Sequence, residues 1–165
     1  MAKRVAYYAN LLALALILSW LENLVPIQMG IPGIKLGLTN IVPVFLLYRN
    51  GWGPALALNI SRILLANLLF GNVMGLLYAL TGGILSTLAM AGLKRLPFLT
   101  AVGVSAAGGV VHNIGQWLAA LLFMPITGLL YYLPFLLLSG VIAGFLVGFV
   151  ARLLIPLPDR IHMRN

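Results

Sequence analysis

Several polar and charged side chains stand inside long apolar stretches of this sequence, and these are the residues that could do chemistry. Glu22 and Arg62 carry the charges, and His112, Asn113 and Gln116 follow further along the chain. An arginine at the centre of a membrane helix costs about 2.5–3.5 kcal/mol even on lenient insertion scales, so Arg62 should face a protein interior or a wet cavity. Guanidinium, imidazole and amide groups there would bind an anionic or carbonyl-bearing molecule.

The composition of the chain is typical of a membrane protein, in which the few charged residues are informative. Only 7% of the 165 residues are charged and 62% are hydrophobic, whereas an ordinary soluble domain has roughly 25% charged residues. The composition therefore predicts a single integral membrane domain over residues 1–165, with the lipid bilayer as its main surroundings. The chain has no cysteine, which excludes disulfides and thiolate metal sites.

Six apolar stretches, separated by proline, glycine, asparagine and basic residues, predict an all-α polytopic protein with six transmembrane helices. The predicted spans are about residues 5–25, 36–48, 52–70, 73–93, 98–123 and 130–155. The second stretch is short and contains Pro43, so we expect it to be kinked or to span only partly.

The basic residues predict the orientation of these spans. If the N-terminus is cytoplasmic, eight basic residues lie on the cytoplasmic side: Lys3, Arg4, Arg49, Lys94, Arg95, Arg152, Arg160 and Arg164. Only Lys35 lies on the outer side. This asymmetry follows the positive-inside rule and predicts that both termini are cytoplasmic. Because the basic residues fall between apolar stretches, the net charge of +8 does not indicate nucleic-acid binding.

With this orientation, most of the intramembrane polar residues fall in the outer half of the bilayer. Glu22 lies near the outer end of the first span, and Lys35 and Asn40 begin the second. Two compatible arrangements are open. Arg62 and Glu22 could form a structural pair that joins two helices, or Arg62, together with Lys35 or His112, could meet a ligand in a pocket that opens outward.

The polar residues of the fifth span allow the same two interpretations. His112 and Gln116 are four positions apart and share one helical face. Histidine, asparagine and glutamine in membrane helices form interhelical hydrogen bonds as readily as they bind ligands. For Asn40 and Asn67 the structural role is the favoured interpretation.

The sequence has no signature of the common catalytic sites. It contains neither a phosphate-binding loop of the P-loop type nor an H-E-x-x-H zinc motif. Its two acidic residues, Glu22 and Asp159, are too few to build the carboxylate-rich magnesium site that diphosphate chemistry needs. We therefore expect no enzyme activity, no metal and no cofactor.

Five segments together resemble a bacterial family called Gx transporters, also labelled heptaprenyl diphosphate synthase component I. These are LE at 21–22, PGIKLGLTN at 32–40, SR at 61–62, LTGGILS at 80–86 and VHNIGQ at 111–116. The resemblance covers about residues 5–155. The family is similar in size and span number to the substrate-binding S-components of energy-coupling-factor (ECF) transporters.

The resemblance to S-components implies a function in the bacterial cytoplasmic membrane. The chain would be the substrate-binding component of a small-molecule uptake transporter, with a transmembrane coupling subunit and ATPases as partners. Ala9 and Ala13, on one face of the first helix, would dock the coupling subunit. The expected substrate-binding residues are Glu22, Lys35, Asn40, Arg62, His112, Asn113 and Gln116.

The family's other label implies an alternative function. The chain would then be a non-catalytic membrane subunit that accompanies a heptaprenyl diphosphate synthase in isoprenoid or quinone metabolism. A homo-oligomeric channel is a third alternative, which the short second span and the absence of a ring of charged residues disfavour. Neither the substrate nor the oligomeric state can be deduced from the sequence.

Overall fold

The computed structural model describes residues 2–24 and 37–156, and within these ranges every regular element is a helix. The elements are α1 (Ala2–Leu24), the short 3-10 helix η1 (Leu38–Asn40), α2 (Ile41–Arg49), α3 (Trp52–Phe70), α4 (Val73–Leu93), α5 (Ala101–Ala120) and α6 (Ile126–Leu154). The all-α class and the six α-helices predicted from the sequence are confirmed.

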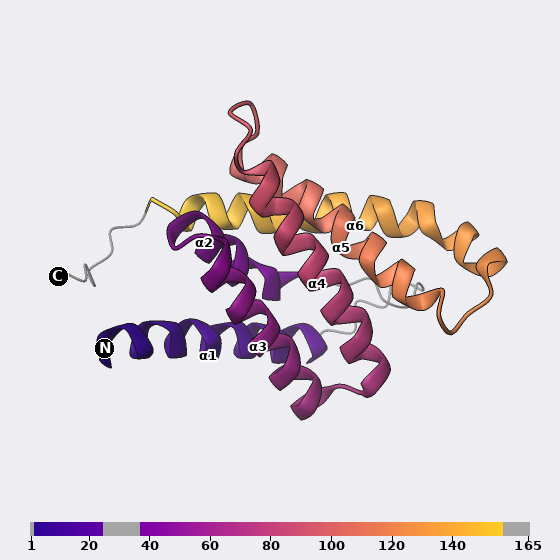
Figure 1. Ribbon diagram of the computed structural model, residues 1–165, viewed down its shortest axis with the longest axis horizontal. Helices are drawn as coiled ribbons and strands as arrows, with labels where there is room; N and C mark the ends of the chain where they lie inside the picture. Colours follow the sequence, from indigo (N-terminus) through magenta and orange to yellow (C-terminus); the bar gives the residue numbers. More distant parts are fainter. Residues whose placement is uncertain (1, 25–36, 157–165) are drawn as a thin grey trace.

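Four of the helices are long and apolar enough to cross a membrane, namely α1, α3, α4 and α6. The apolar stretch of η1 and α2 is shorter than a span, and α5 does not reach the same apolar character. In Figure 1, α1 begins and α6 ends at the same end of the molecule. The long apolar helices are consistent with a membrane protein, while the six-span count and the cytoplasmic termini stay predictions.

The helix boundaries follow local capping chemistry. The Asn72 side chain accepts a hydrogen bond from the Gly75 N–H (2.7 Å) and begins α4, and Thr100 does the same for Gly103 at the start of α5. Such caps satisfy N–H groups that have no partner inside the helix. The helix α5 is shorter at both ends than the expected span 98–123, while α6 begins at Ile126 rather than near residue 130.

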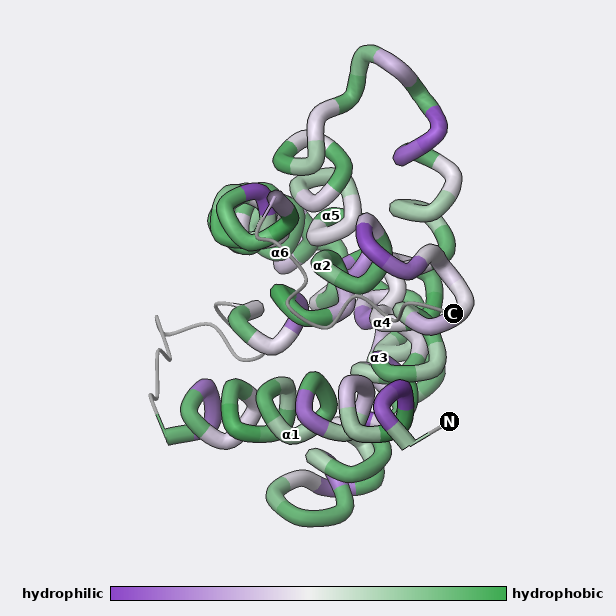
Figure 2. The backbone as a smooth tube through the Cα atoms, turned by 90° about the vertical axis from the view of Figure 1, so that its left-hand side faces the viewer, coloured by the Kyte–Doolittle hydropathy of each residue, from purple (hydrophilic) through white to green (hydrophobic). Residues whose placement is uncertain are grey.

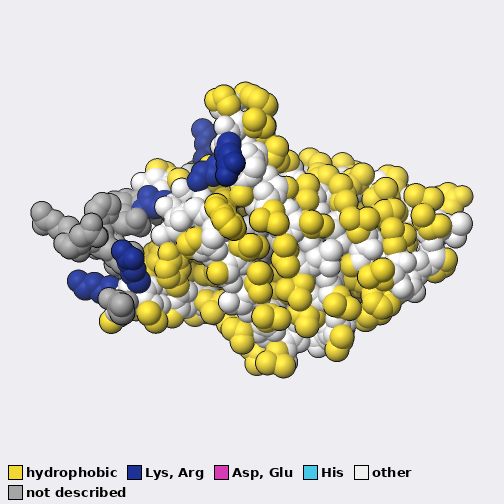
Figure 3. Space-filling view, in the orientation of Figure 1, with side chains coloured by type: hydrophobic (Ala, Val, Ile, Leu, Met, Phe, Trp, Pro, Cys, Tyr) yellow, Lys and Arg dark blue, Asp and Glu magenta, His cyan; other side chains and the backbone are white. Residues whose placement is uncertain are grey.

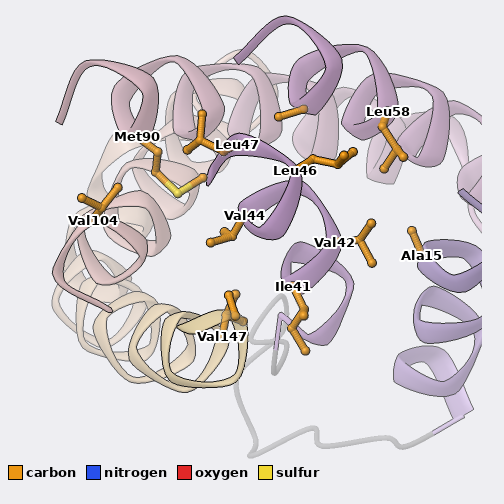
Figure 4. Close-up of a cluster of buried hydrophobic side chains, with 12 residues drawn as sticks. Ala15, Ile41, Val42, Val44, Leu46, Leu47, Leu58, Met90, Val104 and Val147 are labelled. Atoms are coloured by element: carbon orange, nitrogen blue, oxygen red, sulfur yellow. The ribbon is translucent and has the colours of Figure 1, made fainter. Parts of the chain in front are cut away.

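The shortest α-helix is the centre of the core. Six of the nine residues of α2 are buried, and helices from both halves of the chain surround it (Figure 4). The labelled cluster consists of Ala15, Ile41, Val42, Val44, Leu46, Leu47, Leu58, Met90, Val104 and Val147. Pro43 lies in the first turn of this helix, where its missing N–H would have no helical partner.

Glycines bring α5 against both of its neighbours. A methyl group added at Gly109 would lie 2.2 Å from the Gly140 carbonyl oxygen of α6. On the other side, one added at Gly115 would lie 2.8 Å from the Gly82 Cα of α4. Small residues allow membrane helices to approach this closely, so α5 is fixed between α4 and α6. The helix α1 lies on the opposite side of the molecule from the α5–α6 pair (Figures 1 and 2).

The outer surface is apolar and the basic residues gather at one end. Hydrophobic residues predominate along the helices in Figure 2, and large ones such as Leu68 and Tyr131 are 82% and 85% exposed. An exposed apolar surface of this extent fits contact with lipid rather than water. On the face in Figure 3, Lys and Arg side chains cluster where α1 begins and α6 ends and near the α4–α5 connection.

Two basic residues, Lys94 and Arg49, connect the ends of helices by hydrogen bonds. Lys94 Nζ donates to the Leu47 carbonyl at the end of α2 (2.7 Å), and Arg49 Nη1 donates to the Ile155 carbonyl after α6 (2.9 Å). Cations at helix C-termini satisfy unpaired carbonyls and interact favourably with the helix dipole. The basic end therefore fixes α2 relative to α4 and α6, and with α2 it fixes η1, which precedes α2 directly.

Candidate functional site

A cavity of about 300 Å³ lies between α1, η1, α3, α4, α5 and α6. Six of the seven residues predicted to bind a substrate line it: Glu22, Asn40, Arg62, His112, Asn113 and Gln116. The seventh, Lys35, lies outside the described residues. Residues far apart in the sequence therefore converge on one cavity.

Arg62 is the buried cation of this cavity and is only 7% exposed. Its guanidinium donates to Thr39 Oγ1 (3.0 Å), to Asn40 Oδ1 (3.2 Å) and to Asn59 Oδ1. Its buried Nε has no hydrogen-bond partner among the described residues. All three acceptors are neutral, so the positive charge is solvated by dipoles and is not neutralised by a bonded anion.

Asn59 orients Arg62 by connecting it to α4. The Asn59 Nδ2 group donates to the Gly83 carbonyl (3.2 Å) and to Thr87 Oγ1 (3.0 Å), and Thr87 Oγ1 donates to the same carbonyl (2.8 Å). Because the amide nitrogen is occupied by α4, the amide oxygen is left facing Arg62. Asn59 and Thr87 are both buried, and a connected polar network of this kind holds its members in one geometry.

Glu22 binds the residue that precedes the N-terminus of η1. Its Oε1 accepts a hydrogen bond from the backbone N–H of Gly37, the residue that precedes η1. Gly37 has φ of 74°, a left-handed conformation that favours glycine. Glu22 is near enough to act electrostatically on Arg62, but no ion pair joins them among the described residues. Arg62 instead donates to residues of η1 and α3, and Glu22 accepts from Gly37, so the direct pair that the sequence suggested is not seen among the described contacts.

The helix α5 contributes three polar side chains, and they are engaged differently. Asn113 Nδ2 donates to the Leu136 carbonyl (2.6 Å) and to Ser139 Oγ (3.3 Å), which joins α5 to α6. The Gln116 amide has no hydrogen bond within the described part of the chain. His112 packs at the α4 crossing, where a methyl group at Gly82 would lie 3.1 Å from its Nε2.

Sequence reasoning missed several residues of this site. Thr39 and Asn59 bind Arg62 directly, and Ser86 and Ser105 are buried hydroxyl residues that line the cavity. Serine and threonine are common inside membrane helices, where they bond their own backbone, so they give no clear signal in the sequence. Asn59 did have a signal, because its spacing of three from Arg62 places both on one helical face.

The predicted docking residues lie away from the cavity. Ala9 and Ala13 are both exposed on α1, and exposed apolar residues such as Leu14 and Ile17 accompany them. The face is therefore open to contact with lipid or with another membrane protein. Whether a partner occupies it stays a prediction.

The cavity combines hydrogen-bonding groups, one guanidinium and one carboxylate. Among the described residues, no three His, Cys, Asp or Glu side chains come together as they would around a metal ion. Fixed amides, hydroxyls and a buried cation are groups that recognise a polar ligand. Fold and cavity together define an α-helical protein of membrane type with a polar internal cavity.

The chain belongs to the family described as "Heptaprenyl diphosphate synthase component I", which it matches over residues 11–154. That description names one component of a synthase, and the all-helical fold gives no indication of catalysis of its own. No curated protein and no solved structure is detectably similar to the chain. The resemblance to ECF S-components stays a prediction.

Proposed function

We propose that this protein is the substrate-binding component of a small-molecule uptake transporter and is not itself an enzyme. The observation that carries the proposal is the cavity, which polar side chains of α1, η1, α3 and α5 line together with the buried Arg62. A buried intramembrane charge is expensive and usually marks a functional site. A binding role explains why the charge is retained.

The cavity has the dimensions and chemistry of a small-molecule site. Its volume of about 300 Å³ is at the lower end of the range of ligand pockets, roughly 300–1,000 Å³. Polar groups such as Arg62 and Gln116 line it together with apolar ones such as Val44 and Phe70. A polar molecule with some apolar surface would satisfy both kinds of wall.

Transport would require further subunits. The sequence has no nucleotide-binding loop, so the energy would come from ATPases that act through a transmembrane coupling subunit. The exposed face with Ala9 and Ala13 on α1 is the proposed docking site for that subunit. The small alanine side chains would let a partner helix approach closely.

The family description favours a second candidate function, in which the chain is a membrane partner of a heptaprenyl diphosphate synthase. The cavity argues against a role in holding the prenyl chain, because burying hydrocarbon against Arg62 and Asn59 would leave polar groups poorly solvated. A synthase partner would instead have to bind at the outer surface.

The experiment is ligand detection with the full-length protein purified in lipid nanodiscs. Mass spectrometry identifies the small molecule that co-purifies, and its binding is then measured for Arg62→Ala, His112→Ala and the lipid-facing control Leu68→Ala. We expect the first two variants to lose the ligand and to remain folded, while the control retains it. Unchanged binding in the Arg62 and His112 variants would contradict the assignment of the cavity.

A pull-down from the native membrane separates the two candidate functions. Recovery of a coupling subunit and ATPases supports the transporter component. Recovery of a prenyl synthase without them supports the alternative.

A further inference from the structure

Two opposite charges line the cavity without bonding to each other. Arg62 extends from α3 and Glu22 from α1, and both contribute to the wall of the same cavity. Each is instead bound to the short segment between them, Arg62 to Thr39 and Asn40 and Glu22 to the N–H of Gly37. The cavity wall therefore carries a cationic group, the guanidinium of Arg62 on α3, and an anionic group, the carboxylate of Glu22 on α1.

The guanidinium of Arg62 does not use all of its hydrogen-bond donors in the described contacts. Within residues 2–24 and 37–156, Arg62 makes three hydrogen bonds to neutral oxygens, and its Nε has none. A buried guanidinium that no anion bonds directly, within the described part of the chain, bears a desolvation cost that an oxyanion would relieve. The planar guanidinium is suited to carboxylate and phosphate groups, which it binds with paired N–H donors.

The carboxylate of Glu22 can also accept further hydrogen bonds. Among the described contacts, Glu22 accepts one hydrogen bond, at Oε1, although a carboxylate has two oxygens that can each accept more than one. The residue is only partly buried, so its carboxylate can meet a ligand. An ammonium group placed there would gain a charge-assisted hydrogen bond.

Ligand classes differ in how well they match this pair of charges. A simple anion would satisfy Arg62 and be repelled by Glu22, and a simple cation would have the opposite difficulty. A neutral molecule would leave both charges unmatched. Only a molecule with an oxyanion and a cationic donor matches both, and electrostatic complementarity of this kind determines specificity.

We propose that the cavity binds a small zwitterion, with its oxyanion at Arg62 and its ammonium group at Glu22; the proposal rests on the proposed substrate-binding function. The Gln116 amide, which has no partner among the described residues, donates or accepts a further hydrogen bond from the ligand. Asn113 does not contribute its Nδ2 group, because α6 occupies it. The volume of about 300 Å³ fits a molecule of amino-acid size.

The test is a matched ligand series with the full-length protein in lipid nanodiscs, read out by thermal stabilisation and calorimetric titration. The series contains the proteinogenic amino acids, each with its deaminated acid and its decarboxylated amine; for phenylalanine these are 3-phenylpropionate and phenethylamine. We expect at least one amino acid to bind about tenfold or more tightly than both of its counterparts.

Charge variants show whether the two named side chains cause this preference. Arg62→Gln should weaken the zwitterion about tenfold to a hundredfold, as expected for loss of a hydrogen-bonded charge pair. Arg62→Lys, which keeps the charge, should retain the order of preference. Glu22→Gln should weaken the zwitterion and strengthen the deaminated acid, because the repulsion is removed. A merely structural role of Glu22 would not produce this reversal.

Several outcomes would overturn the zwitterion proposal. One is equal binding of the amino acid and its deaminated acid by the wild type, and another is equal weakening of all ligands by Glu22→Gln. If no amino acid binds but a purely anionic, cationic or neutral molecule co-purifies and is lost in Arg62→Ala, the zwitterion proposal fails and the binding function stands. If neither the series nor any co-purifying molecule binds, both fail.

Discussion

The apolar cluster around α2 and the polar cavity around Arg62 lie side by side within the same set of helices. They meet at Val44, Met90 and Val147, which belong to the cluster and also line the cavity. In the cluster, the helices contact aliphatic side chains of α2. In the cavity, they enclose hydrogen-bonding groups. The apolar cluster holds the helices together, and the polar cavity carries the groups that we propose recognise a ligand.

The two regions differ because their helices carry different kinds of side chain. The apolar α2 has fully buried aliphatic residues such as Leu46 and Leu47. The helix α5 carries His112 and Gln116 on one face and packs through glycines. Side chains that fill space stabilise the bundle around α2, whereas the polar groups of α5 line the cavity.

The largest effect on stability should come from the apolar cluster. Leu46 is completely buried, and Leu46→Ala should lower the free energy of unfolding by about 2–5 kcal/mol, because it removes buried methyl groups and leaves a void. Thermal unfolding in nanodiscs measures the loss. The control is Leu68→Ala, at a position that is 82% exposed, where little change is expected.

The same variant tests the separation of the two regions. Leu46 lies outside the cavity lining, so the folded fraction of Leu46→Ala should bind ligand with unchanged affinity. A loss of affinity as large as that of Arg62→Ala would show that the cluster and the cavity are one unit.

Much of the fold could be predicted from local signals. Turn residues such as Gly71 and Asn72 gave boundaries that agree with the end of α3 and the start of α4. The central position of α2 could not be predicted, because a short apolar stretch with Pro43 does not reveal which helices surround it. Its role as the core depends on contacts with helices far away in the sequence.

The sequence predicted most of the polar residues that line the cavity, but it did not predict which of them form hydrogen bonds with each other. Arg62 and His112 are conspicuous in apolar stretches, and both line the cavity. The partners of Arg62 were not predictable, since charge alone suggested Glu22. Its actual acceptors, Thr39, Asn40 and Asn59, depend on where η1 and α3 come together.

The glycine contacts of α5 are the next test, because they shape both regions. Gly109→Ala would place a methyl group 2.2 Å from the Gly140 carbonyl oxygen, so α5 and α6 must separate, at a cost of about 1–3 kcal/mol. Gly92→Ala is the matched control, since a methyl group there meets nothing within 4 Å. Thermal unfolding should separate the two; equal melting temperatures would refute the close packing of α5 on α6.

Asn59 should affect binding more than packing. Asn59→Ala removes one acceptor from Arg62 and leaves the guanidinium free to shift, so affinity should fall by roughly 1–3 kcal/mol, the cost of leaving a buried polar partner unsatisfied. Calorimetric titration measures it. Asn10→Ala is the control, because Asn10 is exposed on α1 and does not line the cavity. A similar loss in both variants would contradict the specific role of Asn59.

The smallest effect on the isolated protein should come from the face of α1 that belongs to neither region. Ala9 and Ala13 are exposed, so Ala9→Leu combined with Ala13→Leu adds side chains that point away from both the cluster and the cavity. Melting temperature and ligand affinity should stay within experimental error of the wild type, because exposed substitutions are usually within about 0.5 kcal/mol. Co-purification with a coupling subunit should nevertheless fall, since leucines hold a partner helix away from the backbone. Normal co-purification of the double variant would exclude this face as the docking site and leave the cavity proposal untouched.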